Sequence, residues 1–102
     1  MLNGEQYNAY IFVHDDKGLC LVLPPLPQLV GKNRWDEKDA NGEYVTRKMV
    51  QAALAKPEGD WVEYIFPKPS SGKLEKKASF VKAVKVGEET LIVGAGVYLQ
   101  AE

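Results

Sequence analysis

The sequence has few of the residues that build catalytic and metal centres. It contains one cysteine, Cys20, and one histidine, His14, so neither an internal disulfide nor a cysteine metal cluster can form. A serine or cysteine nucleophile would have to share that histidine, which we interpret as a solvated residue in a turn between two strands. No enzyme motif is visible. We therefore predict a non-catalytic protein that uses no cofactor.

Long apolar runs and an excess of one charge are missing too. No run approaches the ~20 apolar residues that span a bilayer, and residues 1–6 lack the basic and apolar segments of a signal peptide. The net charge is −1, which argues against recruitment of nucleic acid. The compartment stays open: cytoplasmic if Met1 is the native start, periplasmic if the chain is excised from a longer receptor.

What is present fits one globular domain over residues 1–102. Apolar residues make up 45% of the chain and charged residues 26%, a balance typical of a folded domain. The charge is uneven along the chain. Residues 67–86 hold six lysines against Glu75 alone, which we interpret mainly as a solvated edge hairpin that discourages strand-edge aggregation.

The pattern of aromatic and β-branched residues predicts five strands and one helix. The helix should start at Asn41 as its N-cap, bury the face of Val45, Met49, Ala52 and Ala53, and end before Pro57. The expected strands span residues 7–13, 19–23, 61–66, 77–86 and 90–99. With the long connection of residues 24–42, this order predicts an α+β fold. Its five-stranded antiparallel sheet carries one main helix, with a crossover loop over one face, and forms a cup for a small ligand.

The last predicted strand is apolar on both alternating faces, so we expect it to be central and covered on both sides. Within it, Gly94 and Gly96 leave a bare patch that a helix, another backbone or a ligand could approach closely. The GxG motif they form lacks a following helix, so we interpret it as a packing feature. The carboxylates of residues 36–42 lack the spacing of a calcium-binding loop and are interpreted as a helix-capping turn.

Lysine and aromatic residues are the candidates for a binding site. Lys82 shares a strand face with apolar neighbours, so it either snorkels outward, sits at a bulge or faces a ligand anion. Small-molecule pockets are often lined by aromatic side chains, although in so small a domain such side chains also form the core. The candidate pocket walls are Tyr10, Phe12, Trp35, Trp61, Tyr64 and Phe66.

A series of motifs along nearly the whole chain points to a known family. They are Tyr10-Ile11-Phe12-Val13 with Asp16-Lys17-Gly18, Pro25 to Lys32, Asp36 with Asp39-Ala40-Asn41-Gly42, Gly59 to Tyr64, Phe66-Pro67-Lys68-Pro69, Lys77 to Val81, and Gly94 to Tyr98. In this order they resemble single Cache sensor domains.

The resemblance implies a PAS-like sheet that senses a small molecule, often an organic acid, in chemoreceptors and sensor kinases, usually outside the cytoplasmic membrane. It places the pocket on Tyr10 and Phe12, on Trp61, Tyr64 and Phe66, and on Lys77 or Phe80. In this reading the rings exclude water while a lysine or backbone amide holds the carboxylate.

The family's long N-terminal helix, which covers the back of the sheet, has no counterpart in this sequence. We therefore expect an uncovered sheet face that a homodimer buries. The alternative function is a structural or protein-interaction module that kept the fold without sensing. That alternative predicts a collapsed pocket filled by Trp61, Phe66 and Phe80.

Overall fold

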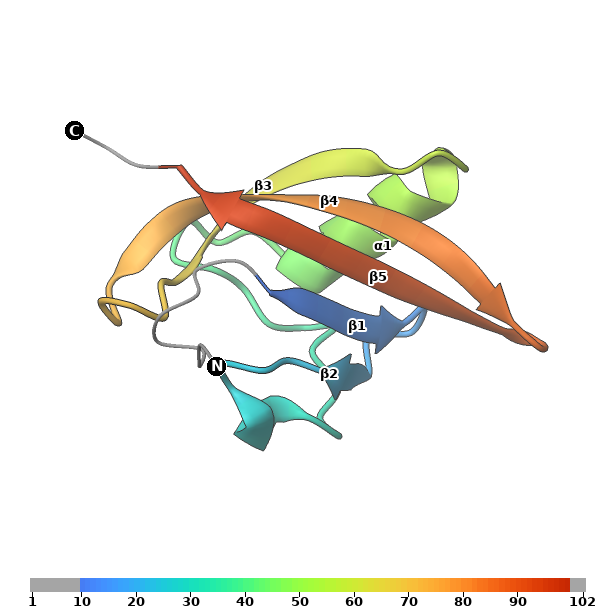
Figure 1. The fold of residues 1–102 in the computed structure, drawn as a ribbon, viewed down its shortest axis with the longest axis horizontal. Helices are drawn as coiled ribbons and strands as arrows, with labels where there is room; N and C mark the ends of the chain where they lie inside the picture. Colours follow the sequence, from blue (N-terminus) through green and yellow to red (C-terminus); the bar gives the residue numbers. More distant parts are fainter. Residues whose placement is uncertain (1–9, 100–102) are drawn as a thin grey trace.

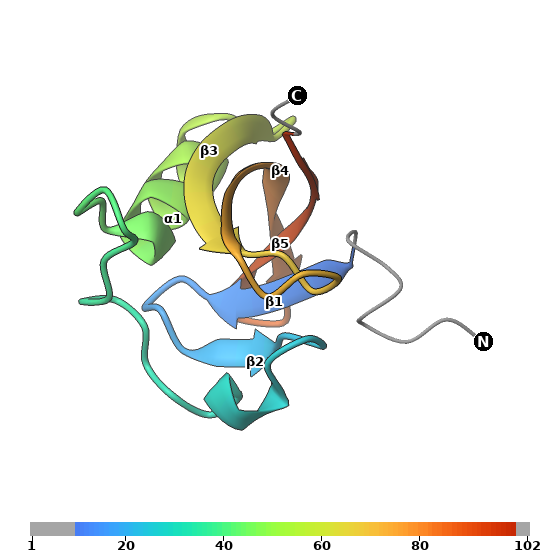
Figure 2. The ribbon, with the colours of Figure 1, turned by 90° about the vertical axis from the view of Figure 1, so that its left-hand side faces the viewer.

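The computed structural model describes residues 10–99, which form a five-stranded antiparallel sheet in the order β2-β1-β5-β4-β3 (Figure 1). One α-helix and the long connection lie on one side of the curved sheet (Figure 2). The predicted α+β class is confirmed. The elements are β1 (Ile11–Asp15), β2 (Cys20–Val22), the 3-10 helix η1 (Pro27–Leu29), α1 (Val45–Ala55), β3 (Asp60–Pro67), β4 (Leu74–Val86) and β5 (Glu89–Tyr98).

The first strand runs further than predicted. It continues through His14 to Asp15, and residues 7–9 of the predicted strand lie outside the described residues. The turn is therefore shorter and starts after Asp15, whose Oδ1 accepts hydrogen bonds from the backbone N–H groups of Lys17 and Leu19, both at 2.9 Å. This aspartate closes the hairpin and leaves His14 inside the sheet.

The helix begins later than predicted. Its N-cap is Tyr44, without a side-chain cap, so the prediction of Asn41 as N-cap is wrong. The side chain that organises this turn is Asp39, whose Oδ1 accepts from the N–H groups of Asn41 and Glu43, both at 2.9 Å. The end of the helix is as predicted, because Lys56 is extended ahead of Pro57.

The connection between β2 and α1 is fixed to the rest of the domain at several points. The other carboxylate oxygen of Asp39 accepts a hydrogen bond from the N–H of Ile65 on β3, at 3.1 Å. Arg47 on α1 donates from Nε to the carbonyl oxygen of Trp35, at 2.9 Å, and forms an ion pair with Asp36. These bonds hold the connection beside the sheet face that α1 also covers.

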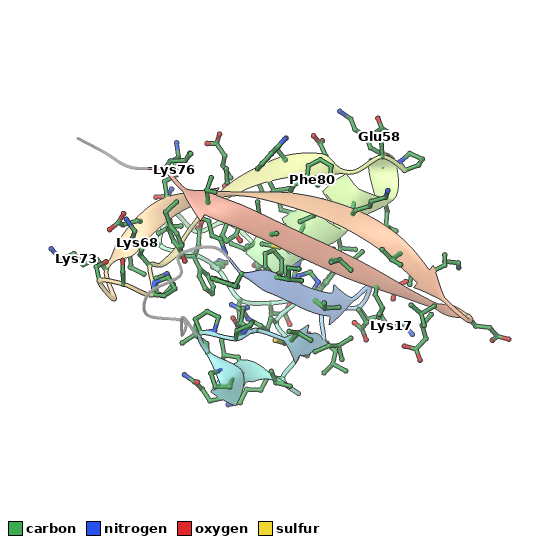
Figure 3. The ribbon with its side chains drawn as sticks, in the orientation of Figure 1. Lys17, Glu58, Lys68, Lys73, Lys76 and Phe80 are labelled. Atoms are coloured by element: carbon green, nitrogen blue, oxygen red, sulfur yellow. The ribbon has the colours of Figure 1, made fainter. Side chains whose placement is uncertain are left out.

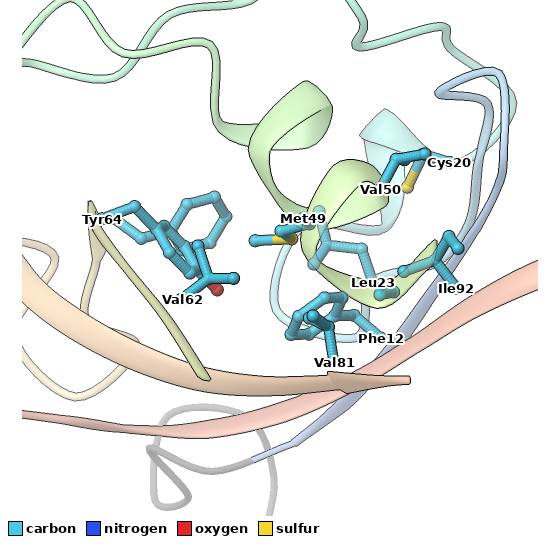
Figure 4. Close-up of a cluster of buried hydrophobic side chains, with 11 residues drawn as sticks. Phe12, Cys20, Leu23, Met49, Val50, Val62, Tyr64, Val81 and Ile92 are labelled. Atoms are coloured by element: carbon cyan, nitrogen blue, oxygen red, sulfur yellow. The ribbon is translucent and has the colours of Figure 1, made fainter. Parts of the chain in front are cut away.

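The core lies between α1 and that face (Figure 4). Met49, Val50 and Ala53 of the helix are buried against Phe12, Val81 and Ile92 of the sheet. Of the predicted helix face, Met49 and Ala53 are buried as expected, while Val45 and Ala52 are only partly buried.

The final strand is central, as predicted. The prediction that it is covered on both sides is wrong for residues 10–99. Ile92 is fully buried on the face toward α1, whereas Val97 is 51% exposed on the other face. Phe80, labelled on β4 in Figure 3, shares that outer face. The apolar residues exposed there are Ile11, Trp61, Phe80, Val84, Val86 and Val97.

Candidate functional site

A cavity of about 390 Å³ lies between the sheet, the start of α1 and the connection. Its wall comes from β1, β2, β3, β4, the segment 34–40 and α1. The volume falls within the range of about 300–1,000 Å³ typical of small-molecule sites. The cavity is open, so the collapsed pocket predicted by the alternative function is absent from residues 10–99.

Lys77 on β4 is the most unusual group in this wall. Its side chain is fully buried, and Nζ has neither a hydrogen-bond partner nor an ion-pair partner among the described residues. Aromatic rings surround the amine instead, with ring centroids between 3.9 and 5.8 Å from Nζ. Attraction to the ring faces partly compensates an ammonium for lost water. The rings are those of Tyr10, Phe12, Tyr64, Phe66 and Tyr98.

The register of the sheet builds this ring of aromatic side chains, which we call the aromatic cage. Lys77 lies opposite Tyr64 of β3 and opposite Tyr98 of β5, so the three side chains form a row on one face. Glycine makes room for the rest of the cage. Gly94 lies opposite Phe12 in the ladder, and a Cβ atom at Gly94 would collide with the Phe12 ring.

Hydrogen bonds hold two of the rings in place. The Tyr64 hydroxyl is 2.8 Å from Oγ of Ser79, which is itself fully buried. The Tyr98 hydroxyl donates to the carbonyl oxygen of Pro67 at 2.6 Å. These bonds fix the rings of Tyr64 and Tyr98, whereas the Tyr10 hydroxyl and Nζ of Lys77 have no hydrogen-bond partner among residues 10–99.

Burial controls the protonation of the cavity wall. It lowers the pKa of Lys77 to about 7 and, together with the charge of Arg34, lowers the pKa of His14 to about 4. Burial also raises the pKa values of Tyr10 and Tyr64 well above their usual range. At neutral pH the histidine and both phenols are uncharged, so among these four groups a positive charge belongs to Lys77.

Further charged residues line the cavity on the segment before α1, and their charges are largely paired. Arg34 donates from Nε to Glu37 at 2.8 Å, and its guanidinium lies 5.7 Å from the centroid of the Phe66 ring. Although partial burial alone would raise the pKa of Asp39, the three backbone N–H groups bonded to it lower that pKa. Lys77 is therefore the buried cation in this wall that lacks an anionic partner among residues 10–99. The exposed Lys38 also forms no ion pair with these residues, and its ammonium lies over the Tyr44 ring.

Five of the predicted site residues meet at the cavity, and four do not. Tyr10, Phe12, Tyr64, Phe66 and Lys77 line it. Trp61, Phe80 and Lys82 lie on the outer face, because they alternate with the core-facing residues of β3 and β4. Trp61 and Phe80 contact each other there, with centroids 5.5 Å apart. Trp35 lies outside the cavity wall, against Gly18 and beneath the Arg47 guanidinium.

The structure adds residues that the sequence analysis missed. His14 is 4% exposed and lines the cavity, so its assignment as a solvated turn residue is wrong. The signal was its position two residues after Phe12, because side chains two apart on a strand point to the same face. Tyr98 joins the cage by the same alternation. No local pattern indicated Arg34, because the connection brings it to the cavity by tertiary folding.

The arrangement is suited to binding a small anion with an apolar body. In its charged form the unpaired amine of Lys77 offers three donors to a carboxylate, and the rings exclude water around it. Within residues 10–99, no group of three or more histidine, cysteine or acidic side chains is placed to hold a metal ion. No helix among these residues is long and apolar enough to cross a membrane.

Comparison with known sequences gives consistent matches. The profile of one family, Single Cache domain 2, matches residues 1–101. The sensor histidine kinase MctS of Rhizobium johnstonii is 36% identical over 92 residues, which are 90% of this chain and 19% of the kinase. The chain thus spans about a fifth of that relative.

Solved structures agree with the sequence matches. A periplasmic sensor domain of a chemotaxis protein is 29% identical with a TM-score of 0.81, over 90% of this chain and 62% of its own. A Cache chemosensory domain described for its recognition of carboxylic acids is 30% identical with a TM-score of 0.82, over 91% and 61%. The chain covers less than two thirds of each.

Proposed function

The chain belongs to the single Cache domain 2 family, and on that premise we propose that it is a non-catalytic sensor domain whose cavity binds a small organic acid. The acid's carboxylate pairs with Lys77, and its body occupies the space between the aromatic cage, α1 and the connection. Because Nζ has no accessible surface in the ligand-free chain, the rings around it move aside as the carboxylate binds. The observation that carries this proposal is the fully buried, unpartnered Nζ of Lys77 in a cavity of about 390 Å³.

The cost of burying an unpaired charge supports this assignment. A buried ammonium without a counter-ion is unfavourable, even among aromatic rings. A bound carboxylate supplies the missing charge and hydrogen bonds. The related Cache structure described for carboxylic acid recognition gives independent support for this ligand class.

The sensor role follows from the relatives. Similar proteins are a chemotaxis sensor domain and a sensor histidine kinase, so the domain's output is a conformational signal passed to a signalling partner or region. By analogy with the periplasmic sensor domain, we place the domain in the periplasm. Kinase activity is a property of the relative's whole chain, of which this domain matches a small part.

The exposed sheet face supports a second part of the proposal, which concerns self-association. Ile11 is 60% exposed, Trp61 59% and Val97 51% on that face. Contiguous apolar surface of more than a few hundred Å² usually marks an interface. A homodimer that packs this face against its copy in a two-fold arrangement would bury it.

Calorimetry and thermal unfolding with carboxylic acids of increasing size test the proposed function. The probes are acetate, propionate, butyrate and benzoate, each with its uncharged amide as a control of nearly equal shape. We expect at least one acid to bind and raise the unfolding temperature, because a ligand that binds the native state alone stabilises it. The amides should not bind.

Two variants connect binding to the cavity. Lys77→Met should abolish binding of the acid. Lys85→Met should retain it, because Lys85 is on the same strand but exposed and outside the cavity wall. Failure of all four acids to bind the wild-type domain, or equal binding by acid and amide, would overturn the proposal.

A further inference from the structure

We propose that the site takes up one proton together with the carboxylate when the acid binds, with Lys77 as the group that accepts it, so that the domain reads acid concentration and pH jointly. The inference rests on the proposed function, because it concerns how the same cavity holds its ligand. The proton comes from bulk water or buffer, and the bound state holds an ammonium–carboxylate pair.

The environment of Lys77 differs from that of other lysines in the domain. Lys48, Lys56, Lys68 and Lys76 each form an ion pair with an acidic side chain, at distances between 3.2 and 3.7 Å. Lys77 forms none with residues 10–99, and it has no solvent exposure. Among residues 10–99, its charge is therefore supported by ring faces alone, the nearest of which belongs to Tyr10 at 3.9 Å.

This geometry makes the amine sensitive to what enters the cavity. Without an anion, burial lowers its pKa to about 7, so near neutral pH a large fraction of the amine is uncharged. A carboxylate beside it favours the charged form and raises the pKa again. Binding above neutral pH must therefore draw a proton onto Nζ.

The other groups around the cavity with shifted pKa values are shifted away from neutrality. His14 on β1 has a pKa of about 4, and burial raises those of the Cys20 thiol on β2 and the Tyr64 phenol on β3. The pKa values of Tyr10 and Tyr98 are raised too, and that of Asp39 is lowered. On the segment before α1, Arg34 forms an ion pair with Glu37. The ammonium of Lys38 lies over the Tyr44 ring. Among the groups with shifted pKa values, Lys77 is thus the one whose pKa lies near neutrality.

The direction of the pH effect follows from this. Below about pH 7 the amine is already charged in the free domain, so the affinity for a carboxylate is nearly constant as long as the acid is ionised. Above about pH 7, Kd rises with pH by up to about tenfold per unit, because one proton must enter with each acid.

Calorimetry on the whole chain tests this coupling. Propionate and benzoate are titrated at about pH 6 and about pH 8, at each pH in two buffers with different enthalpies of ionisation. The buffer dependence of the heat counts the protons taken up. At the higher pH we expect uptake of close to one proton per site and several-fold weaker binding than at the lower pH. At the lower pH we expect little proton uptake.

Controls separate Lys77 from other sources of proton uptake. Lys85→Met should keep both the affinity and the proton uptake. Lys77→Arg holds a permanent charge, so if it binds either acid, the binding should be independent of pH and without proton uptake. Proton uptake that persists in Lys77→Arg would assign the proton to another group and contradict the inference.

The outcomes distinguish the two proposals. Binding of propionate or benzoate to the wild-type chain with the same Kd at both pH values and no proton uptake would overturn the coupling while leaving the sensor function intact. Absence of binding by either acid at both pH values, together with none by acetate or butyrate, would overturn the proposed function and the coupling with it.

Discussion

In the role that we propose for it, Lys77 opposes stability and serves binding. Its amine is fully buried with no partner among residues 10–99, an arrangement that a neutral side chain of similar length would relieve. Replacing a buried ion pair by apolar groups of similar volume is often neutral or stabilising by about 1–4 kcal/mol, and the unpaired charge of Lys77 has no attraction to a counter-ion to lose. The residue therefore makes sense as half of an ion pair whose other half is the ligand.

Lys77→Met should raise the free energy of unfolding of the ligand-free domain by about 1–3 kcal/mol at about pH 6. Methionine keeps the length of the side chain and packs well against aromatic rings. Urea unfolding of both proteins gives this difference. A variant less stable than the wild type would show that the cage supports the charge more strongly than we infer.

The pH dependence of stability should change in the same variant. The pKa of Lys77 is about 7 in the folded chain and about 10.5 when unfolded, so between these values the unfolded state binds more protons. This group therefore makes wild-type stability rise with pH across that window, by up to about 1.4 kcal/mol per unit. The stability advantage of Lys77→Met over the wild type should shrink between about pH 7 and pH 9. A constant difference would contradict the lowered pKa.

At the scale of elements, strand alternation explains most of what the sequence could and could not reveal. Tyr10, Phe12, Tyr64, Phe66 and Lys77 were predicted from residue type and family resemblance, and they meet at the cavity. Strict alternation in β3 and β4 would also have separated Trp61, Phe80 and Lys82 from them. Aromatic content alone does not say which face of a strand a ring occupies.

The connection between β2 and α1 was beyond such reasoning. It has no periodicity, and its position depends on single polar contacts such as the one from Asp39 to the Ile65 N–H. Sequence patterns identified the turn but assigned it to helix capping by Asn41. The contribution of Arg34 to the cavity depends on the same tertiary contacts, so no local signal announced it.

Asp39→Ala should loosen the connection and destabilise the domain. The substitution leaves three backbone N–H groups without their acceptor, and each lost bond costs about 0.5–1.5 kcal/mol. Hydrogen exchange should accelerate at Asn41, Glu43 and Ile65, with a loss of stability in urea unfolding. Asp36→Ala is the control, because its ion pair with Arg47 is exposed and contributes about 0–1 kcal/mol. Equal effects of the two variants would contradict the role of Asp39.

Gly94→Ala should disturb the aromatic cage from the central strand. The added methyl group would collide with the Phe12 ring, and overpacking of this kind costs about 1–3 kcal/mol. Displacement of Phe12 should also weaken acid binding. Ala95→Ser, on the exposed face of the same strand, should change neither. Unaltered stability and affinity in Gly94→Ala would show that Phe12 moves aside without consequence.

At the scale of the whole molecule, the two faces of the sheet have different roles. One face carries α1 and the connection (Figures 1 and 2), with the cavity between them and the sheet. The other face presents exposed apolar side chains. A ligand that shifts β4 or β5 on the inner face also shifts the outer face, because both faces belong to the same strands. This is a physical route from the cavity to the surface that we propose for self-association.

Self-association through the outer face is testable by sedimentation at micromolar concentration. We expect the wild-type chain to dimerise and Val97→Glu to be monomeric, because the substitution places a charge within the exposed apolar surface. Leu54→Glu is the matched control, since Leu54 is 55% exposed on α1, on the other side of the sheet. A monomeric wild type, or a dimer that Leu54→Glu disrupts and Val97→Glu does not, would contradict the proposed interface.

The most direct test of the central claim is a crystal structure of the chain with a bound acid, for which benzoate and propionate are suitable probes. The proposed function requires the carboxylate to lie within hydrogen-bonding distance of Nζ of Lys77, with the body of the acid inside the cavity and the aromatic cage around the ion pair. A carboxylate held by Arg34 with Lys77 left unpaired, or an acid bound only on the outer sheet face, would contradict it.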